Sequence, residues 1–216
     1  MKNLARVTTG IERLDEALMG GIVTPSLVLL IGDIGTGKSV ICQQFIYKHA
    51  SIGTKCVYFC IDHQPEEIIE NMESLEWNVK DLVKKGKIKF VNFFSDIQSF
   101  DSLKADILME ISKCERFVFD SISSIAFLYS EKEAYDLIRK MKIECWKKNR
   151  VGIINAVRGM HSKAFEIAIQ QVCCNVISLE MRSDGRYLRI LKTLKTGHVT
   201  EEFGIDIEKL KGVNLL

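Results

Sequence analysis

The sequence lacks the features that mark a membrane-bound, secreted or strongly charged protein. It has 2 prolines among 216 residues, and its 30 basic and 28 acidic residues leave a formal net charge of +2. No apolar run approaches the ~20 residues of a membrane helix, and the N-terminus has no signal-peptide core. We therefore expect a cytoplasmic protein without direct membrane insertion. The balanced charge also disfavours a strong nucleic-acid binder, because such proteins need a surface that neutralises phosphates.

Metal-site and disulfide patterns are missing as well, although the chain has 7 cysteines. No pair forms C-x-x-C, and no histidine lies at zinc-ligand spacing from a pair. Several of the cysteines fall within apolar runs, where a free thiol packs as a small hydrophobic group. We expect core thiols in a reducing compartment rather than metal ligands or disulfides.

Apolar runs typical of strands alternate with segments that have helical spacing. The strand-like runs cover residues 27–31, 56–61, 88–94, 117–119 and 151–156, and the helix-like segments cover 38–50, 65–75, 102–111 and 131–148. Strands that are apolar throughout, each followed by a helix, predict a mostly parallel central sheet with helices on both faces. After residue 175, three further strand-like runs and the turn signal SDGR predict a C-terminal antiparallel extension. We expect one α/β domain over residues 1–216.

The segment at residues 32–39 reads GDIGTGKS and fits the phosphate-binding pattern G-x-x-x-x-G-K-[ST]. An apolar strand precedes it and a helix follows, as the pattern requires. The glycines let backbone N–H groups approach phosphate oxygens, and the helix N-terminus adds partial positive charge. Lys38 would reach the β- and γ-phosphates, and Ser39 would offer its hydroxyl to Mg²⁺. The predicted cradle comprises Gly32, Asp33, Ile34, Gly35, Thr36, Gly37, Lys38, Ser39 and Val40.

A triphosphate site of this kind also needs a carboxylate on a neighbouring strand for the metal. Asp120 follows the apolar run 117–119, so it lies where a strand would end. Ligands of open α/β sheets bind at that edge. The alternative is that Asp120 caps the next helix. We assign Asp120, together with Ser39, to the metal.

Four longer segments carry a resemblance to a known family. They are TTGIERLDEALMGGI at 8–22, the P-loop at 32–39, MESLEWNV at 72–79 and LKTLKTGH at 191–198. Over nearly the whole chain they resemble the KaiC-like ATPases in the RadA/KaiC group of the RecA superfamily. The resemblance implies a RecA-like P-loop NTPase fold, binding of ATP or ADP with Mg²⁺, and a homo-oligomer such as a hexameric ring. Within the family, the chain looks most like FlaH-type nucleotide-binding proteins of the archaeal motility machinery, which implies a protein partner in a larger assembly. The preference for ATP over GTP rests on this resemblance alone.

One departure from the family concerns the group that activates water. KaiC-like hydrolases usually have two glutamates after the second strand, whereas this chain has Asp62 and His63. Asp62 is one methylene shorter, and a misplacement of about 1 Å can cost ~100-fold in rate. His63 could act as the base instead. The alternative is that both residues cap the helix that begins at Pro65. We assign the catalytic roles to Asp62 and Lys38.

Two further departures weaken the expected coupling to hydrolysis. Where the family often has a polar γ-phosphate sensor after the fifth strand, this chain has Asn155 followed by Ala156, and we expect Arg158 to be a surface charge rather than a sensor. In the C-terminal hairpin, the resemblance assigns Lys192 and its neighbour Lys195 to nucleotide phosphates of an adjacent subunit. The arginine of the family motif is a leucine here, and lysine does not reproduce the fork of an arginine. Solvated strand residues are the alternative for both lysines.

Three functions remain open on this basis. The first is a ring-forming, Mg²⁺-dependent ATPase with slow turnover, and the second is a FlaH-type switch that binds ATP and hydrolyses little. The third is a RadA paralogue that acts on DNA in recombination or repair. Against the third, the ATPase pattern already begins at Thr8 and the loop at 158–164 is shorter than the DNA-contacting loop of recombinases. Salt-dependent binding of single-stranded DNA would favour it again.

Overall fold

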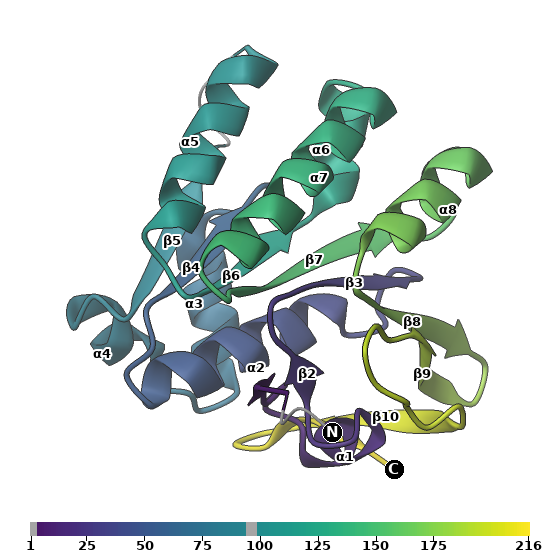
Figure 1. The fold of residues 1–216 in the computed structure, drawn as a ribbon. Coiled ribbons are helices and arrows are strands. Elements are labelled where there is room, and N and C mark those ends of the chain that lie inside the picture. The colour runs from purple at the N-terminus through teal and green to yellow at the C-terminus, as the bar shows by residue number, and fades with distance from the viewer. Residues whose placement is uncertain (1–3, 94–98) are drawn as a thin grey trace.

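A computed structural model describes residues 4–93 and 99–216 of the chain (Figure 1). The described strands are β1 (Arg6–Val7), β2 (Ile22–Val23), β3 (Ser26–Gly32), β4 (Cys56–Cys60), β5 (Ile88–Asn92), β6 (Arg116–Asp120), β7 (Val151–Val157), β8 (Asn175–Arg182), β9 (Gly185–Lys192), β10 (Glu202–Glu208) and β11 (Gly212–Leu215). The described helices are α1 (Glu12–Ala17), α2 (Lys38–Ser51), α3 (Pro65–Ser74), α4 (Val79–Lys84), α5 (Phe100–Ser112), α6 (Ile122–Leu128), α7 (Glu131–Lys147) and α8 (Lys163–Val172).

Nine of these strands form one sheet in the order β11-β10-β9-β8-β3-β7-β6-β4-β5. All pairs from β5 to β8 are parallel, and the pairs β8-β9, β9-β10 and β10-β11 are antiparallel. This is the α/β architecture that the alternating runs predict, with a mostly parallel sheet and an antiparallel C-terminal end. β1 and β2 pair separately as a short antiparallel ribbon.

The antiparallel extension begins one strand later than the sequence predicts. β8, the first strand after residue 175, is parallel to β3, with Val28 opposite Asn175 and Gly32 opposite Leu179. A parallel return needs a crossover, and α8 supplies it. The sequence analysis did not identify α8, so the whole C-terminal run was expected to be antiparallel.

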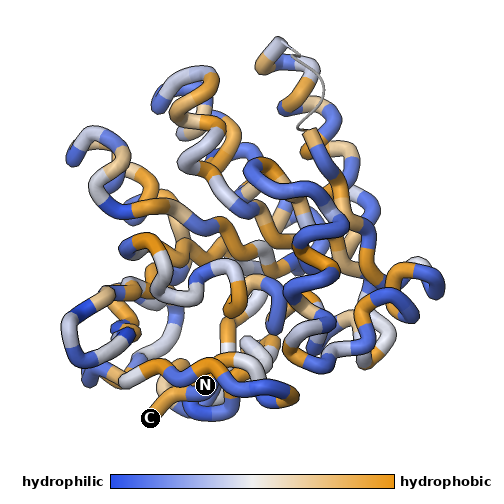
Figure 2. The backbone as a smooth tube through the Cα atoms, turned by 180° about the vertical axis from the view of Figure 1, so that it is seen from behind, coloured by the Kyte–Doolittle hydropathy of each residue, from blue (hydrophilic) through white to orange (hydrophobic). Residues whose placement is uncertain are grey.

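The sheet is buried on both faces, and its central strands are apolar at nearly every position. In β3 the side chains alternate between two cores: Leu27, Leu29 and Ile31 join one, and Val28 and Leu30 join the other. Figure 1 shows α5, α6, α7 and α8 on one side of the sheet and α2 and α4 on the other. Seen from behind, the tube is largely hydrophobic along the central strands and hydrophilic at the outer turns (Figure 2). This double burial fixes the position of every strand end at the sheet edge.

The strands and helices predicted up to residue 156 agree with the structure, and most of the elements that were not predicted are short. Each predicted strand from 27–31 to 151–156 corresponds to β3 to β7, although residue 94 of the run 88–94 lies outside the described residues. The four predicted helices correspond to α2, α3, α5 and α7. The elements that were not predicted are β1, β2, β11, α1, α4, α6 and α8. Most are too short to carry a full period of apolar spacing.

The structure also bears on the cysteines and on membrane-spanning segments. All 7 cysteines are free and buried, as expected for core thiols. Among the described residues, no helix is long and apolar enough to cross a membrane.

Candidate functional site

The segment GDIGTGKS forms the turn between β3 and α2 at the carboxyl edge of the sheet. Gly35 and Gly37 have φ angles of 79° and 90°, a region that side chains with a Cβ rarely adopt. A Cβ on Gly32 would lie 2.2 Å from the carbonyl oxygen of Leu179 on β8. The backbone therefore requires glycine at all three positions. Gly32 allows β3 to pack against β8, and Gly35 and Gly37 allow the turn.

The Lys38 side chain lies inside this turn and is only 7% exposed. Its Nζ donates to the carbonyl oxygens of Gly32 (2.9 Å) and Asp33 (2.6 Å). Burial lowers the pKa of Lys38, while the nearby carboxylates of Asp120 and Asp33 oppose that shift. The Thr36 hydroxyl also donates to the Asp33 carbonyl, at 2.8 Å. These contacts hold a cationic amine at the centre of a turn whose amides belong to the start of a helix, which suits a polyphosphate.

The remaining residues of the predicted cradle lie around this centre. Ile34 is 80% exposed at the tip of the turn, and Val40 packs against the core from α2. Ser39 is half-buried in the first turn of α2. The Asp33 carboxylate accepts a hydrogen bond from the Met181 backbone N–H at 3.0 Å. The cradle is thus tied to β8, the strand beside β3.

Asp120 ends β6 and lies close enough to Lys38 to influence its pKa. Tyr58 on β4 donates its hydroxyl to one oxygen of Asp120 at 2.5 Å, and the side-chain amide of Asn155 on β7 donates to the other. Burial raises the pKa of the Tyr58 phenol, so it remains a donor. The N-cap position of the next helix is Ser121, whose side chain makes no capping hydrogen bond, so Asp120 does not cap that helix and the helix-cap alternative is wrong. A fixed carboxylate and the Ser39 hydroxyl are the hard oxygen donors that Mg²⁺ prefers.

Asp62 follows β4 at the same edge of the sheet. Its two carboxylate oxygens accept hydrogen bonds from the hydroxyls of Ser121, at 3.2 Å, and Ser124. It does not cap α3, because the N-cap of that helix is Gln64. The other candidate base, His63, contacts the Glu67 carboxylate one turn along, with Nδ1 and Oε2 3.1 Å apart. The capping alternative is therefore wrong, and Asp62 is the carboxylate that the structure orients from β4 toward α6.

Two arginines touch the cradle. Arg158 lies 3.6 Å from an Asp33 carboxylate oxygen and donates to the Ser178 hydroxyl, so the expectation of a plain surface charge is wrong. Arg186 on β9 donates from Nε to the Gly35 carbonyl at 2.9 Å. Sequence reasoning missed Arg186, because only the strand register, which pairs it with Met181, brings it to the turn.

The two predicted phosphate-binding lysines lie at the other end of the sheet. Lys192 pairs with Val176, near the start of β8. The cradle instead follows Gly32, the last residue of β3, which pairs with Leu179 farther along β8. The Lys192 amine donates to three carbonyl oxygens at the C-terminal end of α8, and Lys195 lies 4.4 Å from the centre of the Trp146 ring. Within one copy of the chain, the two lysines therefore face away from the cradle.

Comparison with known proteins agrees with the observed fold. The family described as "ATPase: KaiC" matches residues 7–216. A solved KaiC-like protein, PH0186 of Pyrococcus horikoshii OT3, superposes with a TM-score of 0.86 at 27% identity, over 99% of both chains.

Curated relatives are similar over shorter regions. The UPF0273 protein of Thermotoga maritima is 31% identical over 139 residues, which is 56% of this chain and 57% of that protein. The circadian clock protein KaiC3 of Synechocystis is 28% identical over 56% of this chain and 24% of its own length. The chain thus spans little more than half of the first relative and a quarter of the second. With the P-loop between β3 and α2 and the family match over almost all of its length, the chain belongs to the KaiC family of ATPases.

Proposed function

We propose that the chain binds ATP with Mg²⁺ in the turn between β3 and α2 and hydrolyses it slowly. The observation that carries this proposal is the buried Lys38 amine, which lies in a glycine turn and is close to the Asp120 carboxylate. In the bound state Lys38 would exchange its loop carbonyls for phosphate oxygens. Ser39 and Asp120 would hold the Mg²⁺ ion, which neutralises phosphate charge.

Slow turnover follows from the surroundings of Asp62. A general base works best when its lone pairs are available to the attacking water. Here both carboxylate oxygens already accept hydrogen bonds from serine hydroxyls, so fewer of their lone pairs are free to accept a proton from the attacking water. Asp62 can still orient a water molecule, because a carboxylate has about four acceptor sites.

We further propose that nucleotide is bound between copies of the chain. Lys192 and Lys195 lie at the sheet end opposite to the cradle, so any phosphate they contact belongs to a neighbouring copy. A ring-forming ATPase uses this arrangement. Since the Lys192 amine is held by α8 carbonyls, Lys195 is the lysine of this pair that remains available to a neighbour.

A FlaH-type switch, which holds ATP and controls assembly with a protein partner, is the second candidate. The same hydroxyl contacts of Asp62 favour it, because they occupy lone pairs that water activation needs without disturbing the cradle.

Phosphate release from ATP and Mg²⁺, followed past one equivalent per chain, tests these two functions. Lys38→Ala serves as the blank and Asp62→Asn tests the water-orienting carboxylate. Sustained release that both variants abolish supports the slow ATPase. Release that stops at or below one equivalent, with ATP still bound, excludes continuous turnover and favours the switch. Salt-dependent binding of single-stranded DNA would instead favour the recombinase-like function.

A further inference from the structure

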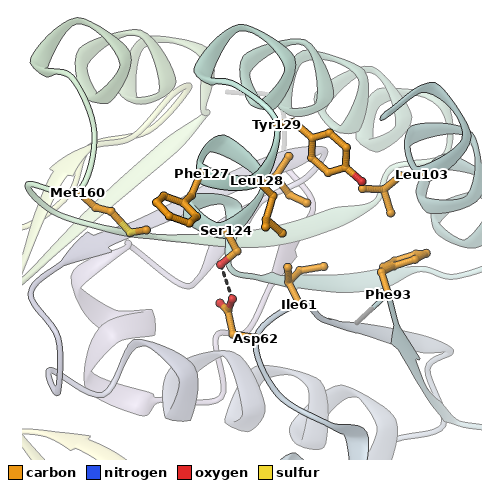
Figure 3. Close-up of a pocket in the computed structure, with 10 residues that line it drawn as sticks. Ile61, Asp62, Phe93, Leu103, Ser124, Phe127, Leu128, Tyr129 and Met160 are labelled. Atoms are coloured by element: carbon orange, nitrogen blue, oxygen red, sulfur yellow. Dashed lines mark hydrogen bonds between the residues drawn. The ribbon is translucent and has the colours of Figure 1, made fainter. Parts of the chain in front are cut away.

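A cavity of about 580 Å³ opens beside Asp62, between the end of β4 and the helices α5 and α6 (Figure 3). Its walls are mostly apolar. The lining residues are Ile61, Asp62, Phe93, Leu103, Ser124, Ile125, Phe127, Leu128, Tyr129 and Met160. Binding pockets have a similar character, with volumes of roughly 300–1,000 Å³, apolar walls and a few polar groups. This cavity is not part of the phosphate cradle, but it shares Asp62 with the water-orienting site.

The rim of the cavity leaves large apolar side chains in water. Phe127 and Leu128 end α6 and are 76% and 66% exposed, and Met160 in the loop after β7 is 46% exposed. Figure 3 shows Phe127 and Met160 close together above the mouth of the cavity. A small molecule confined to the cavity would leave these side chains exposed. A segment of another protein would cover them as well, as buried aromatic anchors do at interfaces.

The negative charge in the cavity lining favours a partner segment that has a positive charge. Asp62 is the one charged side chain among the described lining residues, and its carboxylate points into the cavity toward Ser124 (Figure 3). Its two serine hydrogen bonds leave further acceptor sites on the oxygens. A lysine or arginine would form a charge-assisted hydrogen bond there, and the face of the Phe127 ring also attracts cations. An acidic segment or a nucleic-acid phosphate would be repelled.

We propose that this cavity binds a segment of a partner protein in which an apolar side chain lies next to a lysine or arginine. The apolar side chain fills the space below Phe127, and the basic group binds Asp62. Ser124 lies on α6 one turn before Phe127 and Leu128, so the same helix forms the rim and holds the carboxylate. A bound cation occupies acceptor sites of Asp62 that would otherwise hold the attacking water, so the partner slows ATP turnover. This last consequence rests on the proposed ATPase function, whereas the binding itself does not.

Selection from a phage-displayed library of randomised short peptides tests the proposal on the full chain. Peptides are selected on the unaltered chain alone, so that their binding to Phe127→Ala, which is expected to fold because the ring is mostly exposed, is an independent test. Enriched peptides are then synthesised, and their affinities are measured by fluorescence anisotropy. The variants are Phe127→Ala, Asp62→Asn and, as the matched control for loss of an exposed apolar side chain far from the cavity, Ile52→Ala.

The proposal predicts peptides that pair an apolar residue with an adjacent lysine or arginine. Their affinity should fall at least about tenfold in Phe127→Ala and stay unchanged in Ile52→Ala, and Asp62→Asn should remove the preference for the basic residue. No enrichment, enrichment of acidic peptides, or equal binding to Phe127→Ala would overturn it. Self-association of the chain that Phe127→Ala abolishes would assign the surface to a second copy instead.

Turnover is measured separately. A selected peptide should slow phosphate release by the unaltered chain, and binding without any change in turnover would refute the coupling to Asp62. If the chain releases no phosphate, the proposed ATPase function fails while the peptide affinities still decide the cavity.

Discussion

Replacement of Lys192 by methionine distinguishes a structural lysine from one that serves a nucleotide. Its Nζ donates to the carbonyl oxygens of Gln170, Gln171 and Cys173 at 3.0, 2.8 and 2.8 Å. Each hydrogen bond from a charged donor contributes about 1.5–3 kcal/mol, but the three share one half-exposed amine and do not add. Methionine keeps most of the apolar stem. We therefore expect the free energy of unfolding to fall by about 2 kcal/mol, a decrease in Tm of roughly 4–8 °C for a chain of this size.

Urea unfolding measures this loss, and hydrogen exchange of the α8 amides locates it. Lys195→Met is the matched control, because the Lys195 side chain lies on an exposed ring and makes no carbonyl contacts among the described residues. It should leave stability nearly unchanged. Unaltered stability of Lys192→Met, together with slower phosphate release, would refute the structural role and restore the phosphate-binding one.

Three other changes have clear expected results. Gly32→Ala should lower the midpoint of urea unfolding and abolish binding of a fluorescent ATP analogue, because its Cβ would collide with the Leu179 carbonyl. Arg150→Met should cost about 3–5 kcal/mol in urea unfolding, because a buried guanidinium that donates to three carbonyl oxygens is lost. Burial lowers the pKa of His49, which contacts the Thr8 carbonyl, so stability should fall as pH drops from about 7.5 to about 5.5, and less so in His49→Gln.

The strand, turn and helix of the proposed cradle could be predicted because the residues that form them are contiguous in the sequence. The strand, the glycines, Lys38 and the following helix lie within residues 26–51, and each has a local signature. Asp120 could be placed at the sheet edge for the same reason, since an apolar run ends just before it. Parallel strands with helices between them bring such strand ends together whatever their separation in the chain.

The parts that could not be predicted depend on register and on side-chain direction. Arg186 reaches the cradle only because β8 and β9 pair with Met181 opposite it. The contact between Asn155 and Asp120 joins residues 35 positions apart, and Ser124 meets Asp62 across 62 positions. A single sequence has no signal for such pairs. Likewise, the resemblance assigned Lys192 to a phosphate, whereas only the fold shows that its amine binds carbonyl oxygens at the C-terminal end of α8.

Helix α6 contacts both Asp62 at the end of β4 and the loop that follows β7. Its sequence is rich in serine, a residue that competes with the helix backbone for hydrogen bonds and so gains little from helix formation alone. Ser124 instead holds Asp62, and Ser123 accepts the Val157 backbone N–H and contacts His161. The helix therefore bridges the end of β4 and the end of β7. A protein that binds the exposed end of α6 would act on Asp62 through this bridge, without touching the phosphate cradle.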